Sequence, residues 1–159
     1  MRHAKIKADN IAFFYDLFIT RDSMDNFIIN GYTEYIWEAV VTQEGWLPEA
    51  LSMWRKALAV EPNDSVSRYF ALRCLASEGP VAKKSAIAEL ERSIDANAND
   101  YMARLLLAKL REPADESLRH LETLCLQLPA FYSPWYFRGQ SHFHRREADQ
   151  ALPCLEKAS

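Results

Sequence analysis

Residues 49–64 read EALSMWRKALAVEPND, and residues 85–100 read SAIAELERSIDANAND. Both stretches carry a small residue at the second place, a large apolar residue at the sixth and Asn-Asp at the end. The small and large residues recur with the same spacing at 116–129 and at 150–159. One pattern is therefore present four times in a chain of 159 residues.

The four copies are regularly spaced along the chain. The large apolar residue follows the small one after four places, and successive copies begin 36, 31 and 34 residues apart. The small residues are Ala50, Ala86, Ser117 and Ala151, and the large residues are Trp54, Leu90, Leu121 and Leu155. Self-similarity with a period of this length is typical of stacked helical units.

Each copy has the pattern of an amphipathic helix. In the first copy, Leu51, Trp54 and Leu58 fall on one stripe of a helix with 3.6 residues per turn, while the charged residues face away. Pro62 ends this helix, and the Asn-Asp that follows is a good cap for the next one. The sequence therefore predicts a one-sided helix in each copy.

A second apolar-periodic helix precedes each copy. Short turns join the two helices, and the longest of these turns is SEGPVAKK at 77–84. The preceding helices are expected at Tyr32–Thr42, Val66–Ala76, Tyr101–Arg111 and Pro134–Phe143. The repeating unit is therefore a helix, a tight turn, a second helix and a break.

This pattern resembles the tetratricopeptide repeat, a helix pair of 34 residues. The fourth copy matches the family in its first helix, with Trp135, Gly139 and His142 at the family spacing. The first copy matches in its second helix, with Ala50, Trp54, Ala57 and Pro62. Glu38 stands where the family has Gly or Ala, and the second and third copies lack the opening Trp, so every copy is degenerate.

The resemblance implies an all-α protein, a right-handed α-solenoid of antiparallel helix pairs. The array would cover residues 31–159, divided into units at 31–64, 65–100, 101–131 and 132–159. Residues 1–30 precede the array, and we expect a helical cap or docking segment there, with a strongly apolar helix over 10–20 and a short helix over 24–30.

Composition and motifs exclude several classes of function. The net charge of −3 and the scattered Lys and Arg argue against binding to nucleic acid. The apolar stretch near the N-terminus is too short to span a bilayer, and no signal-peptide pattern follows it. The three cysteines, Cys74, Cys125 and Cys154, read as buried, reduced thiols, which indicates a cytoplasmic protein.

No enzyme chemistry is indicated either. The chain has 4 glycines and no phosphate-binding loop or nucleophile elbow. His142 and His144 lie two residues apart, so on a helix they face different ways and do not form a metal pair. Trp37, Trp54 and Trp135 occupy repeat positions that indicate core packing. We expect a non-enzyme without a cofactor or metal.

In the tetratricopeptide family the first helices of successive units line a concave groove that holds a peptide or a partner's helix. The resemblance places these residues of the chain in that groove: Tyr32, Tyr35, Tyr69, Arg73, Leu105, Lys109, Tyr136, Gln140 and Phe143. Arg73 and Lys109 would set two cations side by side. These groove residues predict that the bound segment of the partner carries apolar side chains and at least one carboxylate.

The expected function is that of an adaptor or scaffold that binds a protein or peptide partner. The alternative is a substrate-docking or oligomerisation module at the N-terminus of a larger enzyme such as a transferase, an expectation based on family analogy. A homodimer could form through residues 10–20 or through the C-terminal face that carries Leu152 and Leu155, because no polar capping helix follows the last unit.

Overall fold

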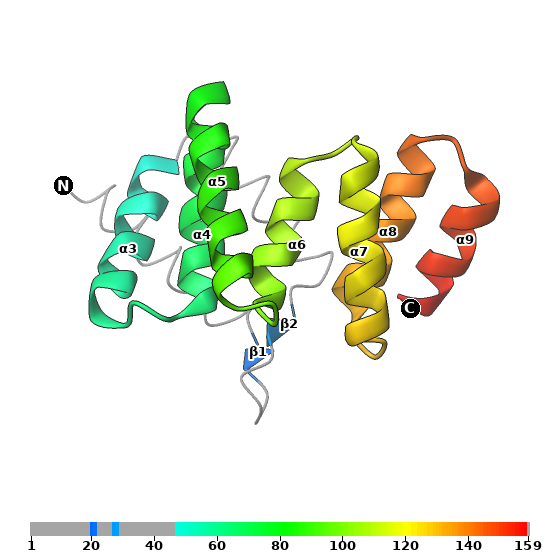
Figure 1. Ribbon diagram of the computed structural model, residues 1–159, viewed down its shortest axis with the longest axis horizontal. Helices are drawn as coiled ribbons and strands as arrows, with labels where there is room; N and C mark the ends of the chain where they lie inside the picture. Colours follow the sequence, from blue (N-terminus) through cyan, green and yellow to red (C-terminus); the bar gives the residue numbers. More distant parts are fainter. Residues whose placement is uncertain (1–19, 22–26, 29–46, 159) are drawn as a thin grey trace, which may run out of the picture. The chain divides into compact units, whose positions relative to one another are not determined.

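The computed structural model describes residues 20–21, 27–28 and 47–158 (Figure 1). The chain divides into two compact units, residues 1–78 and residues 79–159, and each is considered by itself. Apart from one pair of two-residue strands, the secondary structure of the described residues is helical, with seven helices, α3 to α9. Within each unit, consecutive helices pack against one another. The fold is therefore all-α with sequential neighbour packing.

The first unit contains the two strands. β1 (Thr20–Arg21) pairs antiparallel with β2 (Phe27–Ile28), and Thr20 lies opposite Ile28. The short helix expected over 24–30 is therefore wrong at Phe27 and Ile28. The physical reason is that aromatic and β-branched residues favour extended backbone, and so short a helix gains too little to offset its nucleation cost.

The first unit also contains α3 (Leu47–Val60) and α4 (Ser65–Ala76), which pack on each other. Ala50, Leu51 and Trp54 are the buried residues of α3. The indole of Trp54 stacks on the ring of Phe70 from α4, with centroids 5.0 Å apart and planes 20° apart. The apolar stripe that the sequence predicts for this copy is thus the face that α3 buries.

The second unit consists of five helices in chain order. α5 (Pro80–Ala96) packs on α6 (Tyr101–Leu110), which packs on α7 (Asp115–Gln127). α7 in turn packs on α8 (Tyr132–His144), and α8 packs closely on α9 (Ala148–Lys157). Figure 1 shows these helices in green, yellow, orange and red, with α8 next to both α7 and α9. The helix order agrees with the repeating pattern of the sequence.

The breaks between helices have identifiable causes. Asp100, the last residue of the second copy, accepts a hydrogen bond from the backbone N–H of Ala103 at 3.1 Å and caps α6. Ser93 Oγ donates to the same carboxylate at 2.7 Å. The Asn-Asp ending of this copy therefore acts as the helix signal that the sequence predicts.

α5 begins earlier than the sequence suggests. The turn expected over 77–84 ends at Gly79, and Pro80 is already the first helical residue. Proline is well suited to a first helical position because its φ is preset and no N–H is lost there. Gly79 has a φ of 146°, a conformation that residues with a side chain rarely adopt, so glycine is required at this turn.

The repeated positions lie in the core. The small residues Ala50 and Ala86 are 0% exposed, Ser117 is 1% exposed and Ala151 is 3% exposed. The large residues Trp54, Leu90 and Leu121 are also buried, and Leu155 is half-buried. In all four copies the recurring small and large residues therefore take part in helix packing.

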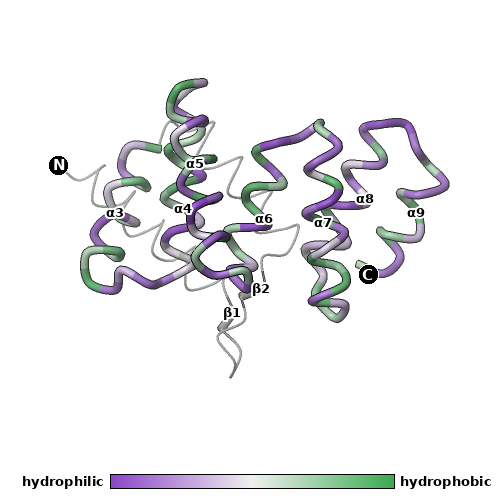
Figure 2. Tube along the Cα trace, viewed as in Figure 1, coloured by the Kyte–Doolittle hydropathy of each residue, from purple (hydrophilic) through white to green (hydrophobic). Residues whose placement is uncertain are grey.

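Two predicted helices lie outside the described residues: the helix over 32–42, and the apolar helix over 10–20 except for Thr20, which belongs to β1. Within the described part, apolar and polar residues are interspersed along each helix, as the colours of Figure 2 show. None of the helices there combines the length and apolarity needed to cross a membrane.

Candidate partner-binding face

The predicted groove residues divide into three groups in the structure. Tyr32 and Tyr35 lie outside the described residues. Tyr69, Arg73 and Leu105 are buried, with 1%, 7% and 5% of their surface exposed. Lys109, Tyr136 and Gln140 are half-buried, and Phe143 is 67% exposed. Only the last four are accessible in this structure.

Tyr69, Arg73 and Leu105 are buried in this structure, and their place in a partner-binding groove stays a prediction. On α4, Tyr69, Phe70, Leu72 and Cys74 are all buried, so apolar residues surround the helix rather than forming one stripe. A helix that is apolar on all sides is buried on all sides. Leu105 belongs to a similar run on α6, from 105 to 108, in which every residue is buried.

α8 presents a continuous stripe that includes three of the predicted residues. Tyr132, Tyr136, Gln140 and Phe143 follow one another at intervals of four, four and three residues, which places them on one side of the helix. The rings of Tyr132 and Tyr136 stack, with centroids 5.3 Å apart and planes 16° apart. Tyr132 was not among the predicted groove residues, although its position one turn before Tyr136 is a signal for it.

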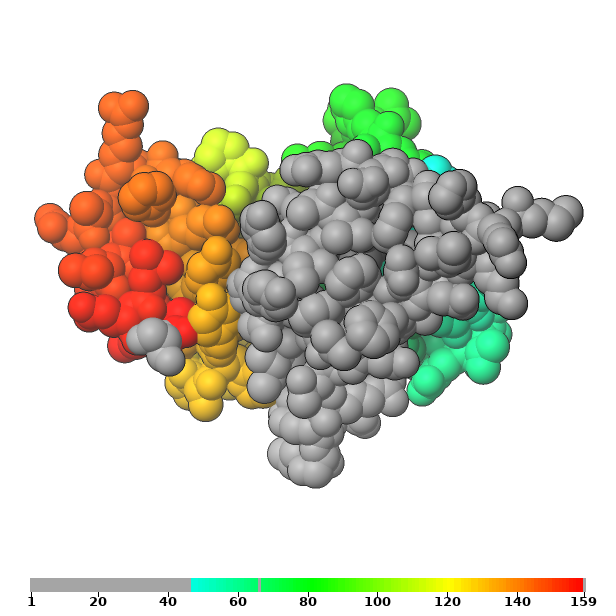
Figure 3. All heavy atoms as spheres, turned by 180° about the vertical axis from the view of Figure 1, so that it is seen from behind, coloured from blue at the N-terminus to red at the C-terminus, as the bar shows by residue number. Residues whose placement is uncertain are grey.

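Lys109 brings a cation from α6 to this stripe. Its Nζ atom lies 4.4 Å from the centroid of the Phe137 ring on α8. The Phe137 ring in turn makes an edge contact with Tyr136 at 5.4 Å. We call the surface formed by Lys109, Tyr132, Tyr136, Gln140 and Phe143 the α6–α8 face. The orange surface of α8 is visible from behind in Figure 3.

Polar contacts hold the carboxyl end of α8 against the turn between α6 and α7. Ser141 Oγ donates a hydrogen bond to Glu112 Oε1. Arg145 donates to the carboxylate of Asp115 at 2.7 Å and to the carbonyl of Pro113 at 2.6 Å. This Arg145 guanidinium lowers the pKa of Asp115 below its ordinary value. The contacts fix where the exposed Phe143 projects.

Contacts on the other sides of α8 fix the helix further. The buried His142 pairs through Nδ1 with the carboxylate of Glu147 at 2.6 Å. Trp135 donates from its indole N–H to the carbonyl of Pro129 at 3.0 Å, and the Lys157 ammonium lies 4.3 Å from the centroid of the indole ring. The α6–α8 face is therefore carried by a firmly held helix. Trp54 is in the core as predicted, Trp135 is half-buried, and Trp37 lies outside the described residues.

A cluster of charges joins α5, α6 and α7 in the same unit. Arg111 lies between the carboxylates of Glu91 and Glu116 and forms an ion pair with each. His120 lies beside this cluster, 3.9 Å from Glu116. Burial, followed by the charge of Arg104, lowers the pKa of His120 below its ordinary value of 6.5. The imidazole is therefore kept neutral in the folded state at neutral pH.

This lowered pKa predicts how stability depends on pH. Because the unfolded chain binds a proton at His120 more readily than the folded chain, the free energy of unfolding decreases as the pH falls below 6.5. We expect the melting temperature to fall less between pH 7.5 and pH 5.5 in a His120→Gln variant than in the native chain. Thermal unfolding monitored by circular dichroism at both pH values tests this, and identical decreases in the two proteins would contradict it.

The three cysteines are buried, as the sequence predicts. Burial raises the pKa of the Cys74 thiol to about 12 and that of Cys125 to about 11. At neutral pH both thiols are protonated, and a thiol is a poor nucleophile or metal ligand in that form. Across residues 47–158, no group of three or more His, Cys, Asp or Glu side chains is arranged to hold a metal ion. His142 is buried and His144 is exposed, which agrees with their expected orientation on different sides of the helix.

Comparisons with known proteins do not add a relative. No protein-family model matches the sequence, and the search of curated proteins gives no match.

Proposed function

We propose that this chain is a tetratricopeptide-like repeat protein that acts as an adaptor or scaffold by binding a peptide or helix of a partner protein on the α6–α8 face. The observation that carries the proposal is the stripe of Tyr132, Tyr136, Gln140 and Phe143 on α8, beside the Lys109 cation. The function requires binding and no chemical step.

The close approach of α8 and α9 supports the repeat assignment. A Cβ atom added to Gly139 would lie 2.7 Å from Leu155 Cγ and 3.2 Å from the carbonyl oxygen of Ala151. Gly139, Ala151 and Leu155 hold the positions at which the tetratricopeptide repeat has its small and large packing residues. The remaining copies supply a buried small residue at the same place, at Ala50, Ala86 and Ser117. This packing supports the proposed assignment of a tetratricopeptide-like repeat.

The composition of the α6–α8 face supports protein binding. Tyrosine offers a large apolar ring and a hydroxyl that can form a hydrogen bond, which makes it frequent at protein interfaces. Phe143 is a large apolar side chain with 67% of its surface exposed, and contact with a partner would remove that surface from water. Because Tyr132 and Tyr136 already stack on each other, little side-chain entropy is lost when they bind.

The face also indicates the chemistry of its partner. The aromatic stripe favours a segment with apolar side chains, and the ammonium group of Lys109 favours a carboxylate opposite it. Cation and ring already lie together at Lys109 and Phe137, so the charge is positioned before binding. A helix or an extended peptide with one acidic and two or three apolar side chains fits this surface.

The proposal predicts the loss of a partner when the face is changed. Tyr136→Ala combined with Phe143→Asp removes one ring and places a charge where the other was. We expect the variant to recover at least about tenfold less of a specific partner from a lysate of the source cell, because two aromatic anchors of an interface commonly contribute more than 1.4 kcal/mol. Quantitative mass spectrometry of the captured proteins measures this.

A matched control distinguishes binding at the α6–α8 face from non-specific association with an exposed apolar side chain. Leu126 on α7 is 79% exposed and does not belong to the α6–α8 face. Leu126→Asp should leave capture of the same partner unchanged, and circular dichroism should show that both variants retain the helix content of the native chain. If the double variant and the native chain recover the same proteins in equal amounts, the α6–α8 face is not the binding site.

A further inference from the structure

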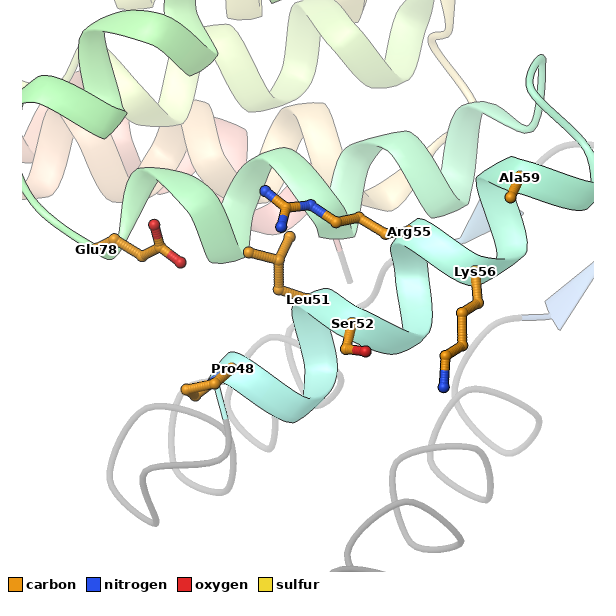
Figure 4. Close-up of a pocket in the computed structure, with 7 residues that line it drawn as sticks. All are labelled: Pro48, Leu51, Ser52, Arg55, Lys56, Ala59 and Glu78. Atoms are coloured by element: carbon orange, nitrogen blue, oxygen red, sulfur yellow. The ribbon is translucent and has the colours of Figure 1, made fainter.

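The first unit carries a hollow that the proposed function does not use. It has a volume of about 440 Å³ and is lined by Pro48, Leu51, Ser52, Arg55, Lys56, Ala59 and Glu78 (Figure 4). We call it the α3 hollow. Six of its seven lining residues come from α3 and follow one another at helical spacing, so the hollow runs along the helix over three turns.

Cations and apolar groups lie together in the α3 hollow. Pro48 and Ala59 provide exposed apolar surface, Leu51 is buried at the base of the hollow, and Arg55 and Lys56 are both exposed. Figure 4 shows the guanidinium group of Arg55 directed back toward Leu51 and Glu78, whereas Lys56 points to the other side of the helix. A ligand along the helix would therefore meet one cation on each side.

These two cations have no carboxylate partner among the residues that the structure describes. By contrast, Arg111, Arg138 and Arg145 each form an ion pair with a carboxylate. Among the described lining residues Glu78 is the single acid, and no ion pair joins it to Arg55. Its backbone N–H is bonded to the carbonyl of Leu75 at 3.0 Å, which fixes its position in the turn after α4. These described residues therefore carry a net charge of +1.

We propose that the α3 hollow binds an acidic peptide segment of another protein, with carboxylates at Arg55 and Lys56 and an apolar side chain against the exposed Pro48. Charge complementarity favours carboxylates, and the guanidinium group can bind one in two-pronged geometry. The exposed Pro48 and Ala59 favour a segment that also carries apolar side chains over a uniformly charged one. Glu78 repels a further acid at its end of the hollow and so sets the direction of the peptide.

A polyanion fits this surface less well. Nucleic acids and anionic membranes bind through many cations, because each neutralised phosphate or lipid adds a small contribution. The α3 hollow offers two cations and one acid, and the whole chain has a net charge of −3. A peptide with a few carboxylates is therefore the assignment that agrees with the two cations of the hollow.

Selection from a displayed library of random dodecapeptides tests the proposal on the full chain. We expect the selected peptides to be enriched in Asp and Glu next to Leu, Ile or Phe. The affinity of a synthesised, fluorescently labelled member, measured by polarisation, should fall at least about tenfold in Arg55→Glu/Lys56→Glu, because two attractive contacts become repulsive. It should also weaken as salt is raised from 50 to 300 mM.

Two further variants make the test specific. Lys84→Glu/Arg92→Glu reverses two exposed cations on α5 and changes the net charge equally, so it should bind the peptide within about twofold of the native chain. Arg55→Gln/Lys56→Gln removes the charges without introducing acids and should still lose binding, which covers the case in which charge reversal unfolds the unit.

The proposal fails under any of three results. The first is a selection without enrichment of acidic residues. The second is equal affinity of the native chain and Arg55→Gln/Lys56→Gln for the selected peptide. The third is tighter binding to a single-stranded 20-mer DNA or to vesicles containing phosphatidylserine than to the peptide. Because the α3 hollow and the α6–α8 face share no residue, the comparison with Arg55→Gln/Lys56→Gln tests the hollow alone and leaves the proposed function untouched.

Discussion

Replacement of Leu121 by alanine is expected to lower the free energy of unfolding by about 3 to 4 kcal/mol. Leu121 is 1% exposed on α7 and holds the large apolar position of the third copy. Truncation removes three buried carbon atoms and leaves a cavity at a place where α7 is packed between α6 and α8. Urea denaturation monitored by circular dichroism measures the change.

The same helix provides the control for Leu121. Leu126 lies five residues further along α7 and is 79% exposed, so Leu126→Ala makes the same chemical change without a cavity. Its effect should remain within about 0.5 kcal/mol, as is usual for surface substitutions. Equal effects of the two substitutions would show that the repeated large residue has no special role in packing.

Replacement of Gly139 by valine is expected to destabilise the protein by about 3 kcal/mol. A Cβ atom at this position would lie 2.7 Å from Leu155 Cγ and 2.8 Å from Leu155 Cδ2, so α8 and α9 would have to separate. In an exposed helix, replacement of glycine normally increases stability, because glycine has the larger entropy to lose on folding. A decrease in the free energy of unfolding on Gly139→Val would therefore show that α8 and α9 approach each other closely at this residue.

The contact with Leu155 is tested by a double-mutant cycle. Gly139→Ala and Leu155→Ala are each expected to destabilise, and the double variant should be more stable than the sum of the two effects predicts, by about 1 kcal/mol. Ala88→Val on the exposed side of α5 controls for the helix propensity of valine, which costs about 0.5 kcal/mol. Additive effects in the cycle would mean that the contact with Leu155 does not restrict the size of the side chain at position 139.

These two predictions concern positions that the sequence alone had singled out. The recurring small and large residues were recognised by their spacing, and the structure places them in the core. Helix caps such as Asp100 are also predictable from the sequence, because a cap depends on residues three or four places away and needs no information from the rest of the fold. Local rules therefore predicted the described helices to within a few residues, except at the start of α5.

The groove itself stays a prediction. Family register assigned Tyr69, Arg73 and Leu105 to it, and all three are buried in this structure, whereas Lys109, Tyr136, Gln140 and Phe143 keep accessible surface. Tyr132 belongs to the aromatic stripe of α8 by helical spacing, although the family register does not place it in the groove. The α3 hollow was not predicted, since Arg55 and Lys56 read in the sequence as an ordinary solvated face.

The sequence by itself determined the helices of the described part, the breaks between them and the four-fold repetition of one packing pair, because periodicity, caps and proline positions act locally. Only the tertiary structure decided which faces of those helices remain accessible. Exposure of a side chain depends on the elements that pack around its helix, and these are distant in sequence. The α6–α8 face and the α3 hollow therefore emerged from packing, with Phe143 left outside the core and Arg73 placed within it.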